Sequence, residues 1–146
     1  MQFWYNKGNH WEPDLHIPNA HGANNEITSI LFFEDNLRFV SRGEDSTMKL
    51  WDLRRPKKPL FVFEDLPCFS TKTGMALSGD ESILLTGTCV KKGHENSKLA
   101  FYSTYNYEKI KDVPICQNSI VSLVWSDKIN QYFIINLESQ PVQMMV

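Results

Sequence analysis

Short runs of apolar residues, separated by polar turns, dominate the pattern of the chain. Ile27–Phe32 is β-branched and partly alternating, and the polar residues at 34–36 separate it from a second run, Leu37–Val40. Thr47–Trp51 alternates strictly and places Met48 and Leu50 on one face. Alternation with period two, bounded by turn residues, is typical of β-strands. We therefore predict four short strands in succession, the fourth within 60–63.

The same grouping recurs along the chain. A second series covers 74–77, 83–86, 98–102 and 107–111, and a third series covers 120–125, 132–135 and 142–146. Ser41 and Thr86 hold the same place in their series and lie 45 residues apart, whereas Trp51 and Phe101 lie 50 apart. Four strands in a unit of about 40–45 residues favour the blades of a β-propeller. A β-sandwich, which also has short strands at even spacing, is the alternative.

Composition limits the classes of function. The chain has 146 residues, 42% of them hydrophobic, so one domain with a core is expected. Its formal charge of −2 argues against a general electrostatic field for nucleic acid, and no apolar run approaches the length of a membrane span. The N-terminus shows no secretory signal. Cys68, Cys89 and Cys116 match no zinc spacing, so reduced thiols in the cytosol or nucleus, without a metal or other cofactor, are expected.

The segment from Asp45 to Asp52 carries the most specific motif. Asp45 lies in the predicted turn six residues before Trp51, Ser41 lies four residues before that acid, and His21 precedes the first strand. A buried carboxylate is tolerated only when donors surround it. An imidazole, a hydroxyl and an indole N–H can form one satisfied chain with it. Ser41, His21 and Asp45 could also be taken for a hydrolytic triad, but the repeat positions favour a structural role.

These residues resemble the end of a WD repeat. The resemblance implies an all-β propeller of four-stranded antiparallel blades, in which His21, Ser41, Asp45 and Trp51 form a structural tetrad. The second series departs from the pattern, because Phe101 replaces the Trp and Glu95 stands at the offset of the acid. The propeller resemblance implies an interaction scaffold and not an enzyme, because no phosphate loop, nucleophile or metal cluster is visible.

A narrower resemblance is carried by short segments that succeed one another in a particular order. They are 12–16, 20–21, 41–43, 50–54, 58–60, 84–88, 97–99 and 130–131. Together they resemble the gastrulation-defective-type WD-repeat proteins, also called the WD-repeat protein 70 family. That resemblance implies a nuclear location, with the cytosol as an alternative, and links to chromatin and the DNA-damage response. A scaffold role in spliceosomal or other ribonucleoprotein assemblies is the rival interpretation.

The repeat pattern predicts a partial propeller. We expect the end of a preceding blade at 1–20, complete blades at 21–66 and 67–113, and the start of a following blade at 114–146. These are about three blades of a probable seven, so the chain is expected to be a fragment of a longer protein. Open strand edges at both ends predict self-association, in which two chains complete each other's blades.

The candidate partner-binding residues follow the third strand of the first complete blade. Trp51 to Arg54 resembles the WDxR motif by which some WD-repeat proteins dock on the cullin-4 ubiquitin-ligase adaptor as substrate receptors. Asp52 and Arg54 are the motif residues, and Arg54 is expected to be exposed for a bidentate bond. Arg55, Lys57 and Lys58 add a basic loop between prolines. An acidic protein surface or phosphate groups could bind this loop, and direct binding of nucleic acid is not expected. The alternative is that the cations, Arg54 included, only keep the surface solvated.

Overall fold

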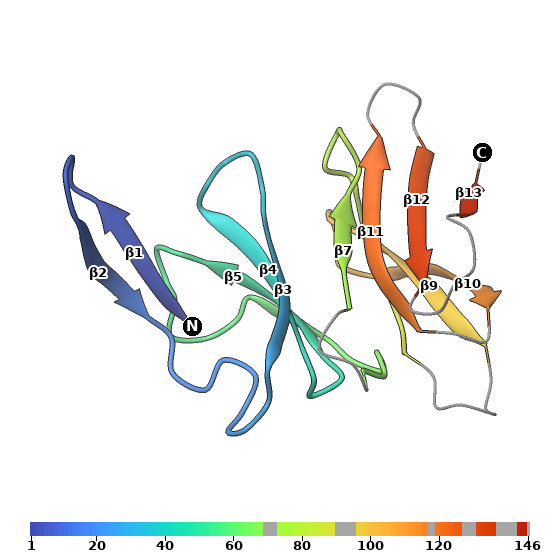
Figure 1. Cartoon of the computed structure of the whole chain (residues 1–146), viewed down its shortest axis with the longest axis horizontal. Helices are drawn as coiled ribbons and strands as arrows, with labels where there is room; N and C mark the ends of the chain where they lie inside the picture. Colours follow the sequence, from blue (N-terminus) through green and yellow to red (C-terminus); the bar gives the residue numbers. More distant parts are fainter. Residues whose placement is uncertain (69–72, 90–95, 117–118, 127–130, 137–142, 146) are drawn as a thin grey trace.

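The computed structural model of the chain describes residues 1–68, 73–89, 96–116, 119–126, 131–136 and 143–145. These residues form antiparallel β-strands joined by turns, and no helix occurs among them (Figure 1). The predicted all-β class with four-stranded antiparallel sheets is confirmed. Among the residues described, no helix has the length and hydrophobicity needed to cross a membrane.

The first half of the chain contains a hairpin and one complete sheet. The hairpin pairs β1 (Gln2–Asn6) with β2 (Trp11–His16). The first complete sheet has the order β3-β4-β5-β6, with β3 at Ile27–Phe32, β4 at Arg38–Gly43, β5 at Met48–Asp52 and β6 at Phe61–Phe63. Each strand pairs with its neighbour in sequence, so this sheet is a simple meander.

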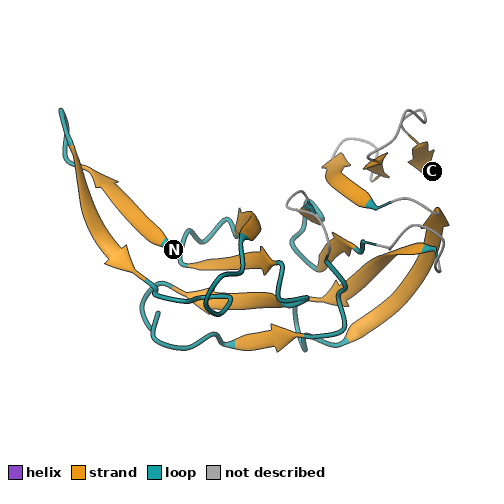
Figure 2. Ribbon diagram, turned by 60° about the horizontal axis from the view of Figure 1, so that its bottom comes forward, coloured by secondary structure: helices purple, strands orange, loops and turns teal. Residues whose placement is uncertain are grey.

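The second half repeats the meander. The second complete sheet consists of β7 (Met75–Leu77), β8 (Ile83–Gly87), β9 (Ser97–Ser103) and β10 (Lys109–Cys116). A three-stranded sheet follows, with β11 at Ile120–Ser126, β12 at Gln131–Asn136 and β13 at Gln143–Met145. The sheets succeed one another along an open arc, with the hairpin at one end and the three-stranded sheet at the other (Figure 2). The first strands of successive sheets lie side by side, since β3 contacts β7 and β7 contacts β11.

Apolar side chains fill the spaces between the sheets. Neighbouring residues of β4 point to opposite sides, so Phe39 packs toward the hairpin and Val40 packs toward the second sheet. Three clusters result, one on each junction between successive sheets. Complete burial of such a side chain contributes about 1.5–3 kcal/mol, and the stacking of sheets therefore supplies the core that no single sheet has.

Several strands differ from their sequence-based bounds. β4, expected to end at Val40, continues to Gly43. β10 begins at Lys109 and extends past the expected blade boundary at 113 to Cys116. Val113 and Ile115 pack on the second core cluster, and this packing continues the strand. Tyr107, expected in the strand, lies in the preceding turn with φ of 62°.

Candidate functional site

The residues of the predicted tetrad come from the β4–β5 hairpin of the first complete sheet and from the loop that precedes this sheet. His21 lies in the loop that leads from the hairpin to β3, Ser41 lies on β4, Asp45 lies in the turn between β4 and β5, and Trp51 lies on β5. Phe39 pairs with Trp51 across β4 and β5, and the two rings stack with centroids 6.2 Å apart. The β4–β5 hairpin therefore fixes three of the four side chains, and His21 reaches them from the loop.

The structure brings the four side chains into one chain of hydrogen bonds. Nδ1 of His21 lies 2.8 Å from Oδ1 of Asp45, and Nε2 of His21 lies 2.7 Å from Oγ of Ser41. The indole N–H of Trp51 donates to the same Ser41 oxygen over 2.9 Å. His21 is 1% exposed and Ser41 is 0% exposed. The hydrogen bonds therefore connect the buried indole of Trp51 to the carboxylate of Asp45, and every polar atom of these groups has a partner.

The direction of this chain follows from the chemistry of its ends. A carboxylate only accepts hydrogen bonds, so Nδ1 of His21 carries the proton given to Asp45. Burial lowers the pKa of His21 and outweighs the opposite effect of Asp45, so the ring is neutral near pH 7. Nε2 then accepts from the Ser41 hydroxyl. Every donor in the set has one acceptor, and this fixes the imidazole orientation.

Asp45 has further partners that the sequence pattern did not identify. Its Oδ1 accepts hydrogen bonds from the amide and the hydroxyl of Thr47, at 3.1 and 2.8 Å. Nζ of Lys49 lies 3.2 Å from Oδ2. Burial opposes ionisation, but the hydrogen bonds from His21 and Thr47 outweigh it and lower the pKa of Asp45. The "Ser-Thr" after the acid and the Lys at its i+4 position are the sequence signals of these contacts.

If Ser41, His21 and Asp45 acted as a hydrolytic triad, a substrate would have to reach Oγ of Ser41, and this structure leaves no access to that atom. Oγ of Ser41 is fully buried, and it lies between the imidazole and the indole N–H. A nucleophile must reach the reacting atom of a substrate at a few ångströms. In this arrangement the three groups stabilise the sheet.

The second complete sheet holds its equivalent strands by other contacts. Phe101, at the place of Trp51, is buried with Leu99 and Ile120 in the second core cluster. Thr86, at the place of Ser41, donates its hydroxyl hydrogen to the carbonyl of Gly74 over 3.2 Å. Glu95, the residue at the offset of the acid, lies outside the described residues. In the described part of this sheet, Phe101 contributes apolar packing and Thr86 a single side-chain bond to the backbone of Gly74 at the places where the first sheet has its linked polar side chains.

Asp52 and Arg54 form the second candidate site. Nε of Arg54 lies 2.9 Å from Oδ1 of Asp52, and Nη2 of Arg54 lies 2.6 Å from Oδ2. The Arg54 amide also donates to Oδ1 over 2.8 Å. The hydrogen bonds from the Arg54 side chain and amide lower the pKa of Asp52 to about 2. The side chain of Asp52 is 9% exposed, whereas that of Arg54 is 64% exposed.

Asp52 therefore fixes Arg54 in place. The expected exposed arginine is present, but its bidentate bond is made within the chain. The bonds to Asp52 use Nε and Nη2, and Nη1 makes no hydrogen bond to the residues that the structure describes. The other three predicted cations, Arg55, Lys57 and Lys58, are exposed on the turn that follows β5.

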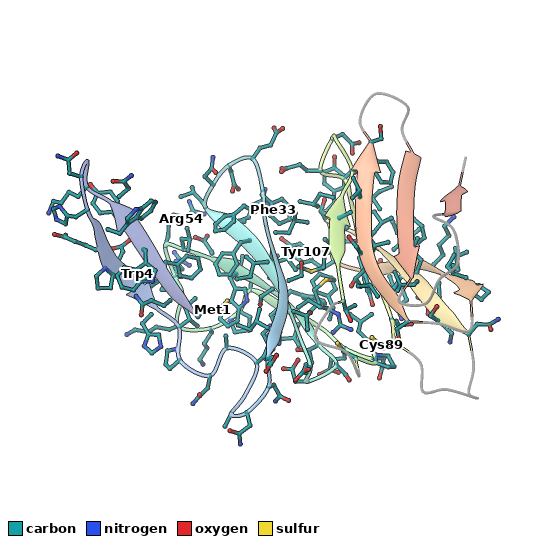
Figure 3. The ribbon with its side chains drawn as sticks, in the orientation of Figure 1. Met1, Trp4, Phe33, Arg54, Cys89 and Tyr107 are labelled. Carbon is teal, nitrogen blue, oxygen red and sulfur yellow. The ribbon has the colours of Figure 1, made fainter. Side chains whose placement is uncertain are left out.

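Exposed aromatic residues lie beside Leu53, the residue before Arg54, and the sequence analysis did not single them out. Trp4 and Tyr5 of β1 line a groove of about 440 Å³ together with Leu53, the residue before Arg54. Figure 3 shows Arg54 on the side of the first complete sheet that is nearest to the hairpin with Trp4. Aromatic residues and arginine are the types that contribute most to protein interfaces. In the described residues, no group of three or more potential metal ligands occurs.

Comparison with known proteins gives a consistent set of relatives, although no family model matches the chain. A region of 118 residues is 37% identical to the gastrulation defective protein 1 homolog of Drosophila melanogaster, and covers 81% of this chain and 18% of that protein. A region of 122 residues is 33% identical to WD repeat-containing protein 70 of Bos taurus, and covers 84% of this chain and 19% of that protein. The chain thus spans about a fifth of the length of these relatives.

Solved structures agree with the fold. The crystal structure of the RRP9 WD40 repeats matches 77% of this chain and 33% of that chain, with a TM-score of 0.61 and 16% identity. The structure of U3-55K matches 77% of this chain and 34% of that chain, with a TM-score of 0.62 and 15% identity. At these identities the likeness concerns the fold alone. Together with the repeated four-stranded meander and the named relatives, it shows that the chain belongs to the WD-repeat β-propeller family and is similar in sequence to one region of WD repeat-containing protein 70.

Proposed function

We propose that the chain acts as a non-enzymatic protein-interaction scaffold, and that Arg54 is the central residue of its binding surface. The observation that carries this proposal is the Asp52–Arg54 pair. A long arginine side chain ordinarily loses much conformational freedom when it binds. Asp52 holds this one in place before a partner arrives. Trp4 and Tyr5, exposed beside Leu53, add apolar area for the same contact.

The partner we propose is the adaptor of the cullin-4 ubiquitin ligase, with this protein as a substrate receptor. The support is the WDxR pattern from Trp51 to Arg54 together with the exposure of the Arg54 side chain. Nη1 of Arg54 would donate to a carboxylate or a backbone carbonyl of the adaptor. As part of this proposal, the protein works in the nucleus in the response to DNA damage on chromatin.

The test is adaptor pull-down with Arg54→Ala. We expect binding to be lost and the fold to be retained, with a small decrease in the melting temperature because the carboxylate of Asp52 loses the partner that lowers its pKa. Arg55→Ala is the matched control, because it removes a neighbouring exposed cation outside the motif and should leave binding intact. Retained binding by Arg54→Ala, or equal loss in both variants, would contradict the proposed role.

A ribonucleoprotein scaffold is the second candidate, and the basic loop favours it. Arg54, Arg55, Lys57 and Lys58 are all exposed within five residues. Such a cluster suits phosphate groups or an acidic protein. Affinity that falls steeply with salt, and falls further in a Lys57→Ala/Lys58→Ala variant, would support phosphate contacts. Affinity that is insensitive to salt would support the adaptor instead.

A further inference from the structure

A second buried polar cluster lies at the junction between the two complete sheets, away from the proposed binding surface. Oγ1 of Thr73 lies 3.1 Å from the sulfur of Cys68 and 3.1 Å from the sulfur of Cys89. All three residues are buried. The two sulfur atoms can therefore be no farther apart than twice this distance.

The main chain also brings the two cysteines together. Cys68 lies in the connection between β6 and β7, and Cys89 lies two residues after the end of β8. The amide of Cys89 donates a hydrogen bond of 2.8 Å to the carbonyl of Pro67, the residue directly before Cys68. Standard bond lengths then limit the separation of the two Cα atoms to about 7 Å. Disulfides span about 4.4–6.8 Å between Cα atoms, so this limit overlaps the range that a disulfide needs.

Arg42 brings a positive charge to the same junction. It is 0% exposed, and its guanidinium donates to the carbonyls of Thr47 and Leu66. In the described part of the chain, Nε has no partner and no carboxylate lies within ion-pair distance of the guanidinium. Burial lowers the pKa of Arg42, and the nearby Cys68 and Cys89 oppose this effect. A cation of this kind favours a thiolate over a thiol.

We propose that Cys68 and Cys89 form a redox-sensitive pair that a peroxide converts to a disulfide. In molecules whose junction has opened locally and admits the peroxide, the thiolate of one cysteine attacks a peroxide oxygen and the O–O bond breaks. A sulfenic acid forms, and the departing hydroxide takes up the proton that the thiol released and leaves as one water. The sulfur of the second cysteine then attacks the sulfenic sulfur, forms the S–S bond and releases the second water. The two thiols are oxidised by two electrons and the peroxide is reduced by two. Arg42 is a positioning residue that stabilises the attacking thiolate.

The disulfide would link the connection between the two sheets to the second sheet itself. The connection already accepts a hydrogen bond from Arg42 of β4 at Leu66, and Thr28 of β3 donates its hydroxyl hydrogen to the carbonyl of Thr73. The covalent link would therefore fix a segment that contacts both sheets. Closing a loop of this size is expected to raise the melting temperature by about 5–10 °C.

The test uses the full chain in its reduced form. After incubation with hydrogen peroxide and alkylation of the remaining thiols, peptide mapping without reductant should find Cys68 linked to Cys89, with the loss of two hydrogen atoms and reversal by a dithiol. Cys116→Ser is the control and should give the same link. No link, a link that involves Cys116, or links between chains would overturn the proposal.

The role of Arg42 is tested by the rate at which the link forms. Arg42→Met keeps a side chain of similar length without the charge, and we expect link formation to slow by about tenfold. Peptide mapping of the natural chain decides the proposal even where this variant fails to fold. An unchanged rate in a folded Arg42→Met variant would remove Arg42 from the mechanism.

Discussion

At the scale of single residues, the tetrad couples protonation to stability. His21 has a pKa below its ordinary value of 6.5 because burial disfavours the imidazolium. The unfolded chain therefore binds a proton at a higher pH than the folded chain does. The stabilisation from neutral His21 is complete above pH 6.5 and is lost as the pH falls from 6.5 through the lowered pKa. Asp45, whose pKa lies below 3.8, adds a second loss only in stronger acid.

We therefore expect the free energy of unfolding to fall as the pH decreases below 6.5. Urea unfolding at a series of pH values, followed by tryptophan fluorescence, measures this quantity. His21→Asn removes the titrating group and should flatten the curve in this range. A curve with the same slope in both proteins would show that His21 is not the group responsible.

Ser41 and Trp51 are expected to differ in the cost of substitution. Ser41→Ala leaves both the indole N–H and Nε2 of His21 without a partner, and should cost about 1–3 kcal/mol for each such group. Trp51→Phe removes one donor and leaves Ser41 bonded to His21, so its polar cost should be about 1 kcal/mol. Equilibrium unfolding of the two variants measures the difference. Because Trp51→Phe also loses buried apolar area, the decisive comparison is Ser41→Ala in the Trp51→Phe background, where it should cost less than in the natural chain since the indole N–H is already gone. An equal cost in both backgrounds would contradict the hydrogen bond between Trp51 and Ser41.

At the scale of elements, the end of each second strand lies against a side chain from a neighbouring segment. A Cβ atom on Gly43 of β4 would overlap the ring of His21, and a Cβ atom on Gly87 of β8 would overlap Ile120. The two glycines are 44 residues apart and end equivalent strands. Each glycine therefore leaves space for a side chain of another segment. At Gly43 this segment is the preceding loop with His21, and at Gly87 it is the following strand with Ile120.

Gly43→Ala is expected to destabilise the chain by about 1–3 kcal/mol, because His21 is held by hydrogen bonds and cannot move away. A double-mutant cycle with His21→Ala separates this overlap from other effects. In the His21→Ala background the added methyl group should cost much less. An equal cost in both backgrounds would place the strain elsewhere.

The sequence predicted the strands better than it predicted the contacts between sheets. Alternation and turn residues identified the two meanders, because these are local properties. The left-handed turn at Glu81 was not predictable, since glutamate rarely adopts its φ of 57°. There the carboxylate accepts a hydrogen bond from the amide of Glu34 on the neighbouring sheet. The burial of Arg42 was not predictable either, because arginine is ordinarily a surface residue. Its burial is explained only by the contacts that form where the two complete sheets pack together.

At the scale of the whole molecule, the arc has sheets with open edges. β1 pairs only with β2, and the C-terminal sheet contains three strands in the described residues. Unpaired strand edges and the exposed Trp4, Tyr5 and Trp11 favour association. That two chains complete each other's sheets stays a prediction.

Sedimentation of the purified chain should accordingly show a species of twice the monomer mass that increases with protein concentration. Trp4→Ser/Trp11→Ser, which reduces the apolar area of the hairpin, should shift the equilibrium toward monomer. A single monomeric species over the whole concentration range would count against association through the hairpin.

The polar tetrad belongs to one sheet, and the described part of the next sheet carries Phe101 where that tetrad has Trp51. The free energy of local unfolding should therefore decrease along the arc, from the first complete sheet toward the C-terminal sheet. Backbone amides of β4 and β5 would retain their hydrogen atoms longest in heavy water, and those nearer the C-terminal sheet would exchange sooner. The expected consequence is that the sheet that carries Arg54 keeps its shape under conditions in which the sheets nearer the C-terminus open.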